Sequence, residues 1–309
     1  MKAVSIIHLL VLMLAACGGN AEPPDSGSNG ETKAVAKLKR QRDAIVKFFE
    51  PMKINEGDWL ETQKESGETF EEYIISDPTL PTDERRTIYI QPIGKFTKLQ
   101  SETIEKAAEY MRAFYSLPVK VNATTALGKV PVDQKRLIKY RNNLQIKTSH
   151  FTDDVLPKLL PEDAAALIAF TNYDLYPEPT WAFVFGQASL DKRVGVWSLY
   201  QFADPKTGKY DSMLLLERTL KVAMHEVGHM FSMKHCTKYE CLMSGTNHLA
   251  ETDRRPLDNC PECMAKVAWA MKYDPADRYR KLAEFWQTNG NALESVKMLE
   301  KARAVVAIR

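Results

Sequence analysis

The sequence lacks a charge imbalance, an internal repeat and an apolar run long enough to cross a bilayer. Its 42 Lys and Arg residues nearly balance 40 Asp and Glu residues, for a net charge of +2. This balance gives no support for a protein that binds nucleic acid. Hydrophobic residues make up 44% of the 309-residue chain and charged residues 27%, which excludes wholesale disorder. We expect a globular protein of one or two domains.

Cysteine is scarce and unevenly placed. The chain has five cysteines, of which one is Cys17 and four lie between residues 236 and 263. If every cysteine were intended for a disulfide, an odd count would leave one thiol over. The distribution instead separates a single cysteine from a cluster of four, so the two groups need separate explanations.

Residues 1–16 predict a secretory signal peptide, because a basic start is followed by an uncharged run that ends at Cys17. The letters LAAC at 14–17 resemble the bacterial lipoprotein box, which implies that Cys17 carries a lipid and becomes the first mature residue. A plain secreted protein with a chance cysteine is the alternative. Residues 17–34 are rich in Gly, Ser and Pro and predict a flexible tether. We therefore expect a membrane-anchored, extracytoplasmic bacterial lipoprotein.

The body of the chain alternates between strand and helix patterns. Residues 86–121 run strand-helix-strand, which indicates an α/β unit. Residues 52–86 are mixed and polar and show no clear pattern. Apolar and alternating runs predict strands at 86–93, 119–121, 164–170, 181–185 and 194–202, and helices at 33–50, 99–117 and 211–234. Residues 276–309 predict two amphipathic helices, which we expect to pack on the body rather than to form a separate scaffold for partners.

The longest predicted helix carries the letters HEVGH, from His225 to His229. Two histidines four residues apart lie on one helical face and can bind one zinc ion, and Glu226 can reach a water on that ion. Two surface histidines without a metal are the alternative. His235 can join them if the chain turns after about residue 232. Three protein ligands and one open position are typical of a catalytic zinc.

The four clustered cysteines form two close pairs. Cys236 and Cys241 directly follow the third histidine, and Cys260 and Cys263 follow after a loop. This spacing favours a closed structural zinc bound by four thiolates. Two disulfides are the alternative, because the body of a lipoprotein faces an oxidising compartment.

The combined pattern resembles the archaemetzincins, a branch of the metzincin zinc peptidases with a catalytic zinc and a nearby zinc held by four cysteines. The matching letters are HEVGH at 225–229, His235-Cys236, Cys241-x-Met243 and Cys260-x-x-Cys263. The resemblance implies an α+β fold with a metzincin-like mixed twisted sheet, an active-site helix, a four-cysteine zinc subsite and C-terminal helices. It covers residues 85–275, which leaves 35–84 as an N-terminal helical extension and 276–309 as a C-terminal helical segment.

The resemblance also assigns roles outside the ligands. Met243 becomes the Met-turn residue under the catalytic zinc, and the edge strand that binds substrate includes Phe183, Val184, Phe185 and Gly186. One departure is Ser232, where the family has glycine at a sharp turn. A left-handed residue other than glycine costs on the order of 1 kcal/mol, so we expect a strained turn there.

The implied function is a zinc-dependent peptide hydrolase with two zinc ions, acting as an aminopeptidase or small-peptide protease on a peptide or protein substrate. Glu226 is then the general base that takes a proton from a zinc-bound water. The alternative is a non-catalytic, zinc-stabilised peptide-binding lipoprotein. Glu226 argues against that alternative, because a purely structural site does not need its carboxylate.

We predict that a soluble form without residues 1–17 binds two zinc ions. Replacing the four clustered cysteines by serine should remove one zinc and destabilise the fold, because metal binding to such a site contributes directly to folding. Metal analysis and intact-protein mass spectrometry measure both effects. Two disulfides and a single zinc in the unmodified protein would contradict the second metal site.

Overall fold

The computed structural model describes residues 32–139, 143–189 and 192–308. The predicted signal peptide, Cys17 and most of the predicted tether lie outside these ranges. Helix α1 (Lys33–Ala44) includes the last two residues of the expected tether, and the Thr32 side chain caps it by accepting a hydrogen bond from the amide of Val35. No helix within the described ranges has the length and apolar character needed to span a membrane.

The larger sheet has five strands in the order β2-β1-β5-β8-β7, and the first four are parallel. Strand β7 pairs antiparallel with β8 at the edge, so the sheet is mixed, as predicted. All residues of β1 and β5 are buried, as expected for parallel strands covered on both faces. The bounds are β1 (Thr87–Ile93), β2 (Val119–Val121), β5 (Ala164–Thr171), β7 (Gly186–Ser189) and β8 (Val194–Ser198).

A smaller sheet is formed by three segments for which the sequence predicts no strands. Its order is β3 (Lys135–Ile138), β4 (Asn143–Lys147) and β6 (Asp174–Tyr176). The buried carboxylate of Asp174 accepts hydrogen bonds from Asn143 at 2.6 Å and Gln145 at 2.7 Å, which join β6 to β4. In β4 the polar side chains of Asn143 and Gln145 are buried while Leu144 between them is exposed, so apolar residues do not mark the buried face of this strand.

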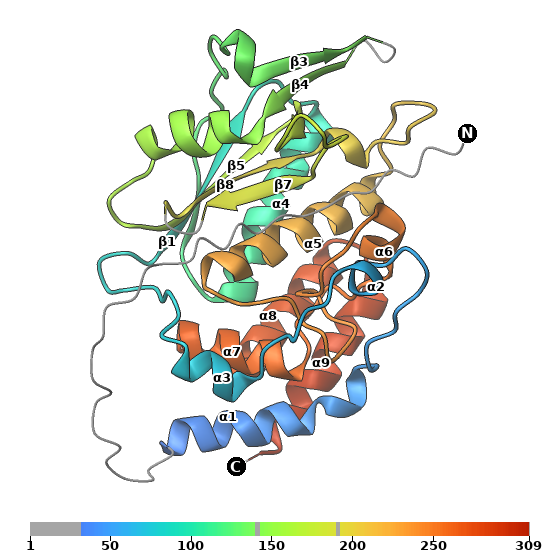
Figure 1. The fold of residues 1–309 in the computed structure, drawn as a ribbon. Coiled ribbons are helices and arrows are strands. Elements are labelled where there is room, and N and C mark those ends of the chain that lie inside the picture. Colours follow the sequence, from blue (N-terminus) through green and yellow to red (C-terminus); the bar gives the residue numbers. More distant parts are fainter. Residues whose placement is uncertain (1–31, 140–142, 190–191, 309) are drawn as a thin grey trace.

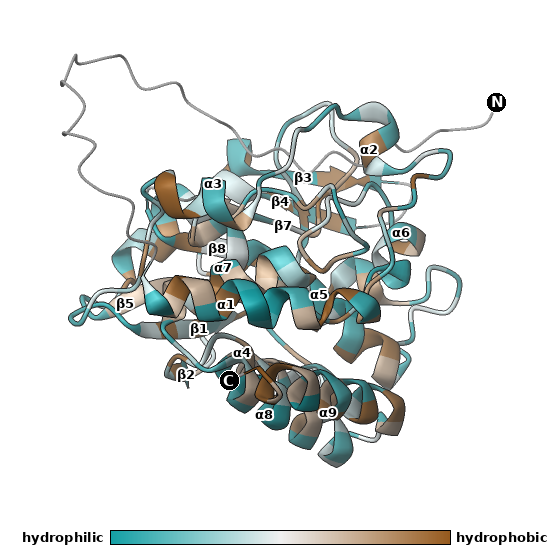
Figure 2. Cartoon of the chain, turned by 90° about the horizontal axis from the view of Figure 1, so that it is seen from below, coloured by the Kyte–Doolittle hydropathy of each residue, from teal (hydrophilic) through white to brown (hydrophobic). Residues whose placement is uncertain are grey.

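Helix α5 (Ser212–Met230) lies between the larger sheet and a layer of further helices (Figure 1). Helices α8 (Pro275–Thr288) and α9 (Ala292–Val306) lie side by side in both ribbon views (Figures 1 and 2). Helix α8 packs on α4 (Lys98–Tyr115), and α9 packs on α1. The remaining helices are α2 (Trp59–Thr62), α3 (Phe70–Ile75), α6 (Leu249–Arg254) and α7 (Pro261–Met271). Short turns are η1 (Val46–Phe48), η2 (Val132–Gln134), the π-helix η4 (His150–Val155), η5 (Leu156–Lys158) and η6 (Tyr200–Phe202).

The strand predicted at 181–185 is wrong. The structure begins β7 at Gly186, so Phe183, Val184 and Phe185 precede the edge strand. Carbonyl groups of Trp181 and Ala182 accept hydrogen bonds from the side chain of Arg136 instead of from a neighbouring strand. The amide of Val184 donates to Leu175 of the smaller sheet at 2.9 Å. The backbone therefore crosses from one sheet to the other before it joins β8.

Residues 50–79, which we call the N-terminal strap, wrap around the segment that carries the third histidine and the first cysteines. The amide of Met52 donates to Lys238 at 3.1 Å, and the amide of Phe70 donates to the carboxylate of Glu262 at 3.0 Å. The hydroxyl of Tyr73 donates to the carbonyl of Phe231 at 2.7 Å. The strap is held by partners far along the chain, which explains why its local sequence shows no pattern.

A buried ion cluster ties the C-terminal helices to the second cysteine pair. Asp258 accepts hydrogen bonds from Arg278 of α8 and Lys301 of α9, both at 2.8 Å. Arg278 also donates to the carbonyl of Phe114 in α4 at 3.0 Å. Asp258 lies two residues before Cys260, so three helices converge on the loop that presents this cysteine.

We predict that Asp258→Ala lowers the free energy of unfolding by about 3–5 kcal/mol, because it leaves two buried cations without their carboxylate. Burial opposes the ionised form, but Lys301 and Arg278 lower the pKa of Asp258 overall. The stabilisation should therefore be complete above the unfolded pKa of about 3.9 and be lost as the pH falls through the folded value.

Chemical denaturation at several pH values measures this effect. Asp277→Ala is the matched control, because it breaks the exposed pair with Arg280 and should cost at most about 1 kcal/mol. Equal losses from the two substitutions would contradict the role of the buried cluster.

Candidate metal centres

The first candidate centre is built by α5 and the turn that ends it. Asp211 caps the helix by accepting a hydrogen bond from the amide of Leu214 at 2.8 Å. The helix ends at Met230, and Ser232 adopts the left-handed conformation with φ of 63°. This turn returns the chain, so that the His235 ring lies 5.2 Å from the His225 ring and 4.9 Å from the His229 ring, between centroids.

The left-handed turn has a local partner that offsets its cost. The hydroxyl oxygen of Ser232 accepts a hydrogen bond from the amide of Thr79, at the end of the strap, with a length of 3.0 Å. One such bond contributes about 0.5–1.5 kcal/mol, which is comparable to the cost of the backbone conformation. Serine at this position is therefore compatible with the turn that three-histidine geometry requires.

Each histidine has a fixed partner at Nδ1. His225 donates to the carbonyl of Leu242 at 2.9 Å, His229 to the carbonyl of Met233 at 2.6 Å, and His235 to the carboxylate of Glu65 at 2.9 Å. A proton on Nδ1 leaves a lone pair on Nε2. The Nε2 atoms of His225 and His229 lie 2.9 Å apart, and Nε2 of His235 is buried without a partner. Three converging lone pairs fit a metal ion.

Burial sets the protonation of this centre. Burial, with a contribution from His235, lowers the pKa of His225 to about 3. Burial also lowers the pKa of His229, so both rings are neutral at pH 7, as metal ligands must be. Burial raises the pKa of Glu226 to about 8. A cation among the histidines would favour the ionised carboxylate and lower that value.

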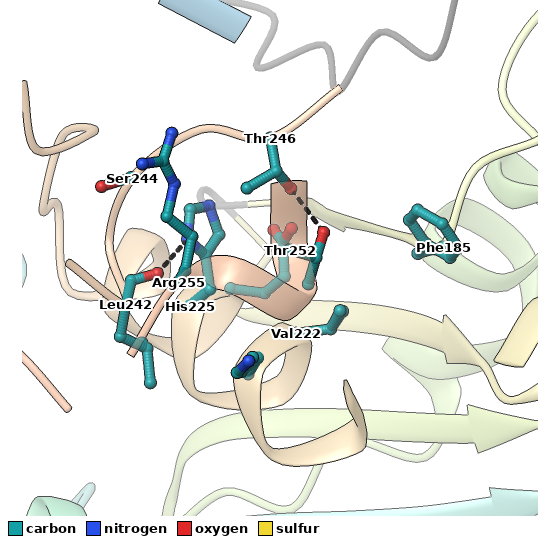
Figure 3. Close-up of a pocket in the computed structure, with 10 residues that line it drawn as sticks. Phe185, Val222, His225, Leu242, Ser244, Thr246, Thr252 and Arg255 are labelled. Atoms are coloured by element: carbon teal, nitrogen blue, oxygen red, sulfur yellow. Dashed lines mark hydrogen bonds between the residues drawn. The ribbon is translucent and has the colours of Figure 1, made fainter. Parts of the chain in front are cut away.

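A cavity opens beside His225 and Glu226. Its apolar wall includes Phe185, Val222 and Leu242. Figure 3 shows the hydroxyl groups of Thr246 and Thr252 facing each other on another side, with a hydrogen bond of 2.9 Å between them. The cavity offers a bound molecule space next to Glu226. Phe185, which directly precedes the edge strand, also lines it.

The second candidate centre contains the four predicted cysteines, which are buried and free. Their four sulfur atoms all lie within 4.8 Å of one another, and the Sγ atoms of Cys236 and Cys260 are 3.5 Å apart. A disulfide needs about 2.05 Å, whereas four thiolates around one zinc stand about 3.8 Å from one another, given Zn–S bonds of about 2.3 Å. The amides of Met243 and Cys260 donate to Cys241 at 3.4 and 3.2 Å. The group therefore fits a tetrahedral metal.

A buried lysine supplies positive charge next to these sulfur atoms. Burial lowers the pKa of Lys266, but Cys263 and Glu68 outweigh it and raise the pKa overall. Its ammonium group donates to the carbonyl and the carboxylate of Glu68, at 2.7 and 2.9 Å. Lys266 thus remains charged and links the strap to α7.

Met243 connects the two centres. Its carbonyl accepts a hydrogen bond from the amide of Cys236 at 2.8 Å. Its side chain is fully buried against Gly228 of α5, where an added Cβ atom would lie 2.5 Å from Sδ. The residue assigned to the Met-turn therefore lies directly under the helix that carries His225 and His229.

A third group of possible ligands, Asp58, His248 and Glu251, has protein partners instead. Arg254 donates to Asp58 at 2.6 Å, and Arg255 donates to Glu251 at 2.6 Å. The two guanidinium groups neutralise both carboxylates, so we assign no metal to this group.

The sequence analysis missed Glu65 and Trp59. Glu65 lies 170 residues before His235 in the chain, and the ring of Trp59 meets the His235 ring edge-on, with centroids 5.3 Å apart. Neither residue belongs to a motif, and their segment has no periodicity. No local signal in the sequence could have found them.

Comparisons with known proteins give a consistent result. Residues 88–268 match peptidase family M54. Archaemetzincin-2 of Mus musculus is 34% identical over 77% of this chain and 75% of its own length. Archaemetzincin-2 of Homo sapiens is 35% identical over 77% of this chain and 74% of its own length. The crystal structure of archaemetzincin from Methanopyrus kandleri is 27% identical, covers 62% of this chain and 99% of that chain, and has a TM-score of 0.49.

We predict that Gly228→Ala destabilises the fold by about 1–3 kcal/mol, because the new methyl group overlaps Met243 in a packed interior. In an unobstructed helix the same change stabilises by up to about 1 kcal/mol. The double variant with Met243→Ala removes the obstructing sulfur atom, so in that background Gly228→Ala should become neutral or stabilising. Thermal and chemical unfolding of the four proteins measure the coupling. An equal cost in both backgrounds would show that Met243 is not the obstacle.

Proposed function

Because the chain belongs to peptidase family M54, the archaemetzincins, and is thus a zinc metallopeptidase, we propose that Glu226 is its general base. The zinc ligands in this proposal are His225, His229 and His235. The observation that carries it is the convergence of three Nε2 lone pairs, one of which is buried without a protein partner. Glu226 follows the first ligand on α5 and lines the adjacent cavity.

The proposal divides the chemistry between the zinc ion and Glu226. Zinc held by His225, His229 and His235 would supply Lewis acidity, which makes a water molecule more acidic and polarises the scissile carbonyl. Glu226 accepts the proton of the attacking water and delivers it to the leaving amine. A cation held by the three histidines would keep this buried carboxylate ionised, which is the form that can accept the proton.

Substrate binding would use the edge of the larger sheet. Strand β7 is the last strand in the sheet order, and Phe185 directly before it lines the cavity next to Glu226. An extended peptide that adds to this edge by main-chain hydrogen bonds would pass its scissile bond beside the three histidines. Short peptides and amino-terminal residues are the substrates that we propose.

The second zinc in this proposal is structural and is held by the four cysteines. Support comes from four buried sulfur atoms within 4.8 Å and from the continuity of His235 with Cys236. A closed metal site there would hold Cys241 before Met243 and Cys260 after it, and so fix the chain on both sides of Met243. The same loop provides the carbonyl partner of His225.

The test compares digestion of a peptide library by the wild type and by Glu226→Ala. We expect the substitution to lower kcat/KM by about 10²–10⁴-fold while the zinc content stays unchanged, because Glu226 is not a ligand. The cleavage products show whether residues leave from the amino terminus or from within the peptide. Negligible cleavage by both proteins, with zinc retained, would favour the peptide-binding alternative.

A further inference from the structure

The third histidine differs from the other two in the partner behind its ring. His225 and His229 donate from Nδ1 to main-chain carbonyls of nearby residues, Leu242 and Met233. His235 donates to a carboxylate, with both oxygen atoms of Glu65 at 2.9–3.0 Å from Nδ1. Among the three, His235 is the one whose partner carries a charge.

Glu65 belongs to the strap, which precedes residues 88–268, the span matched by the family model. Trp59 packs edge-on against the His235 ring, and its amide donates to the buried carboxylate of Glu251 at 3.1 Å. Beyond Glu65, the amide of Thr79 donates to Ser232. The strap is therefore fixed on both sides of Glu65, and the carboxylate reaches His235 from a held position.

The geometry excludes Glu65 as a ligand of the metal itself. Its carboxylate lies at Nδ1, whereas the buried and unpartnered atom of His235 is Nε2, on the other side of the ring. A carboxylate in this place holds the ring in one tautomer and orientation and makes the imidazole a stronger electron donor.

We infer that Glu65 is a positioning residue for the catalytic metal, acting through His235, and that the strap is thereby a functional part of this centre. The inference rests on the proposed function in one respect, the assignment of His235 as a zinc ligand. It adds a residue from the strap, which precedes the residues that the family model matches.

The test measures zinc affinity and not only activity. Glu65→Gln keeps the size and one acceptor oxygen but removes the charge, and Glu65→Ala removes both. We expect affinity at the three-histidine centre to fall about 10-fold for Glu65→Gln and up to about 100-fold for Glu65→Ala, by competition with a chromogenic chelator. The zinc at the four cysteines should keep its wild-type affinity, and the absorption spectrum of the cobalt-substituted histidine centre should shift.

Glu61→Gln is the matched control, because Glu61 lies in the same strap and accepts a bond from Gly57 without touching His235. Wild-type affinity in Glu65→Ala would overturn the inference, and so would an equal loss at both zinc centres together with a lower melting temperature. A wild type that binds zinc but cleaves no peptide would refute the proposed function, while the zinc affinities would still test the role of Glu65. A wild type that binds no zinc at the histidines would refute both.

Discussion

The three Nδ1 hydrogen bonds are the interactions on which the arrangement of this protein depends. Each ring is buried and must have its proton accepted, and each acceptor comes from a different element. Leu242 belongs to the loop between the cysteine pairs, Met233 to the left-handed turn after α5, and Glu65 to the strap. The loop, the turn and the strap have no regular structure at these points, so their positions are determined by the partners they serve and by the anchors that hold them.

Those anchors join the two candidate centres into one unit. The amide of Leu242 donates to the main-chain carbonyl of Asp258 at 3.1 Å, and the carbonyl of Met243 accepts from the amide of Cys236. Lys266 binds Glu68 of the strap next to the cysteines. A displacement at the four sulfur atoms would therefore move the carbonyl behind His225. Gly228 completes the contact, since a larger residue there would push Met243 away from the helix. Support for the histidines thus comes from the cysteine loop as much as from α5.

The elements that could be predicted were those whose signal is local. The helix with HEVGH and the buried strand now called β5 follow from apolar periodicity, and the cysteine cluster follows from spacing. Glu65 could not be predicted, because its role depends on a contact between segments 170 residues apart. The strand expected at 181–185 failed for a related reason, since its backbone partners are the side chain of Arg136 and the smaller sheet. Apolar residues alone do not reveal which neighbour takes the main-chain hydrogen bonds.

The ion cluster at Asp258 has a consequence for the order of events during synthesis. Its two cations lie 20 and 43 residues later in the chain, at Arg278 and Lys301. The cluster is therefore complete only when the last helix is in place, although the cysteines that it supports lie about 40 residues earlier in the chain. A chain that stops before Lys301 would contain all four cysteines but would leave Asp258 with one of its two cations.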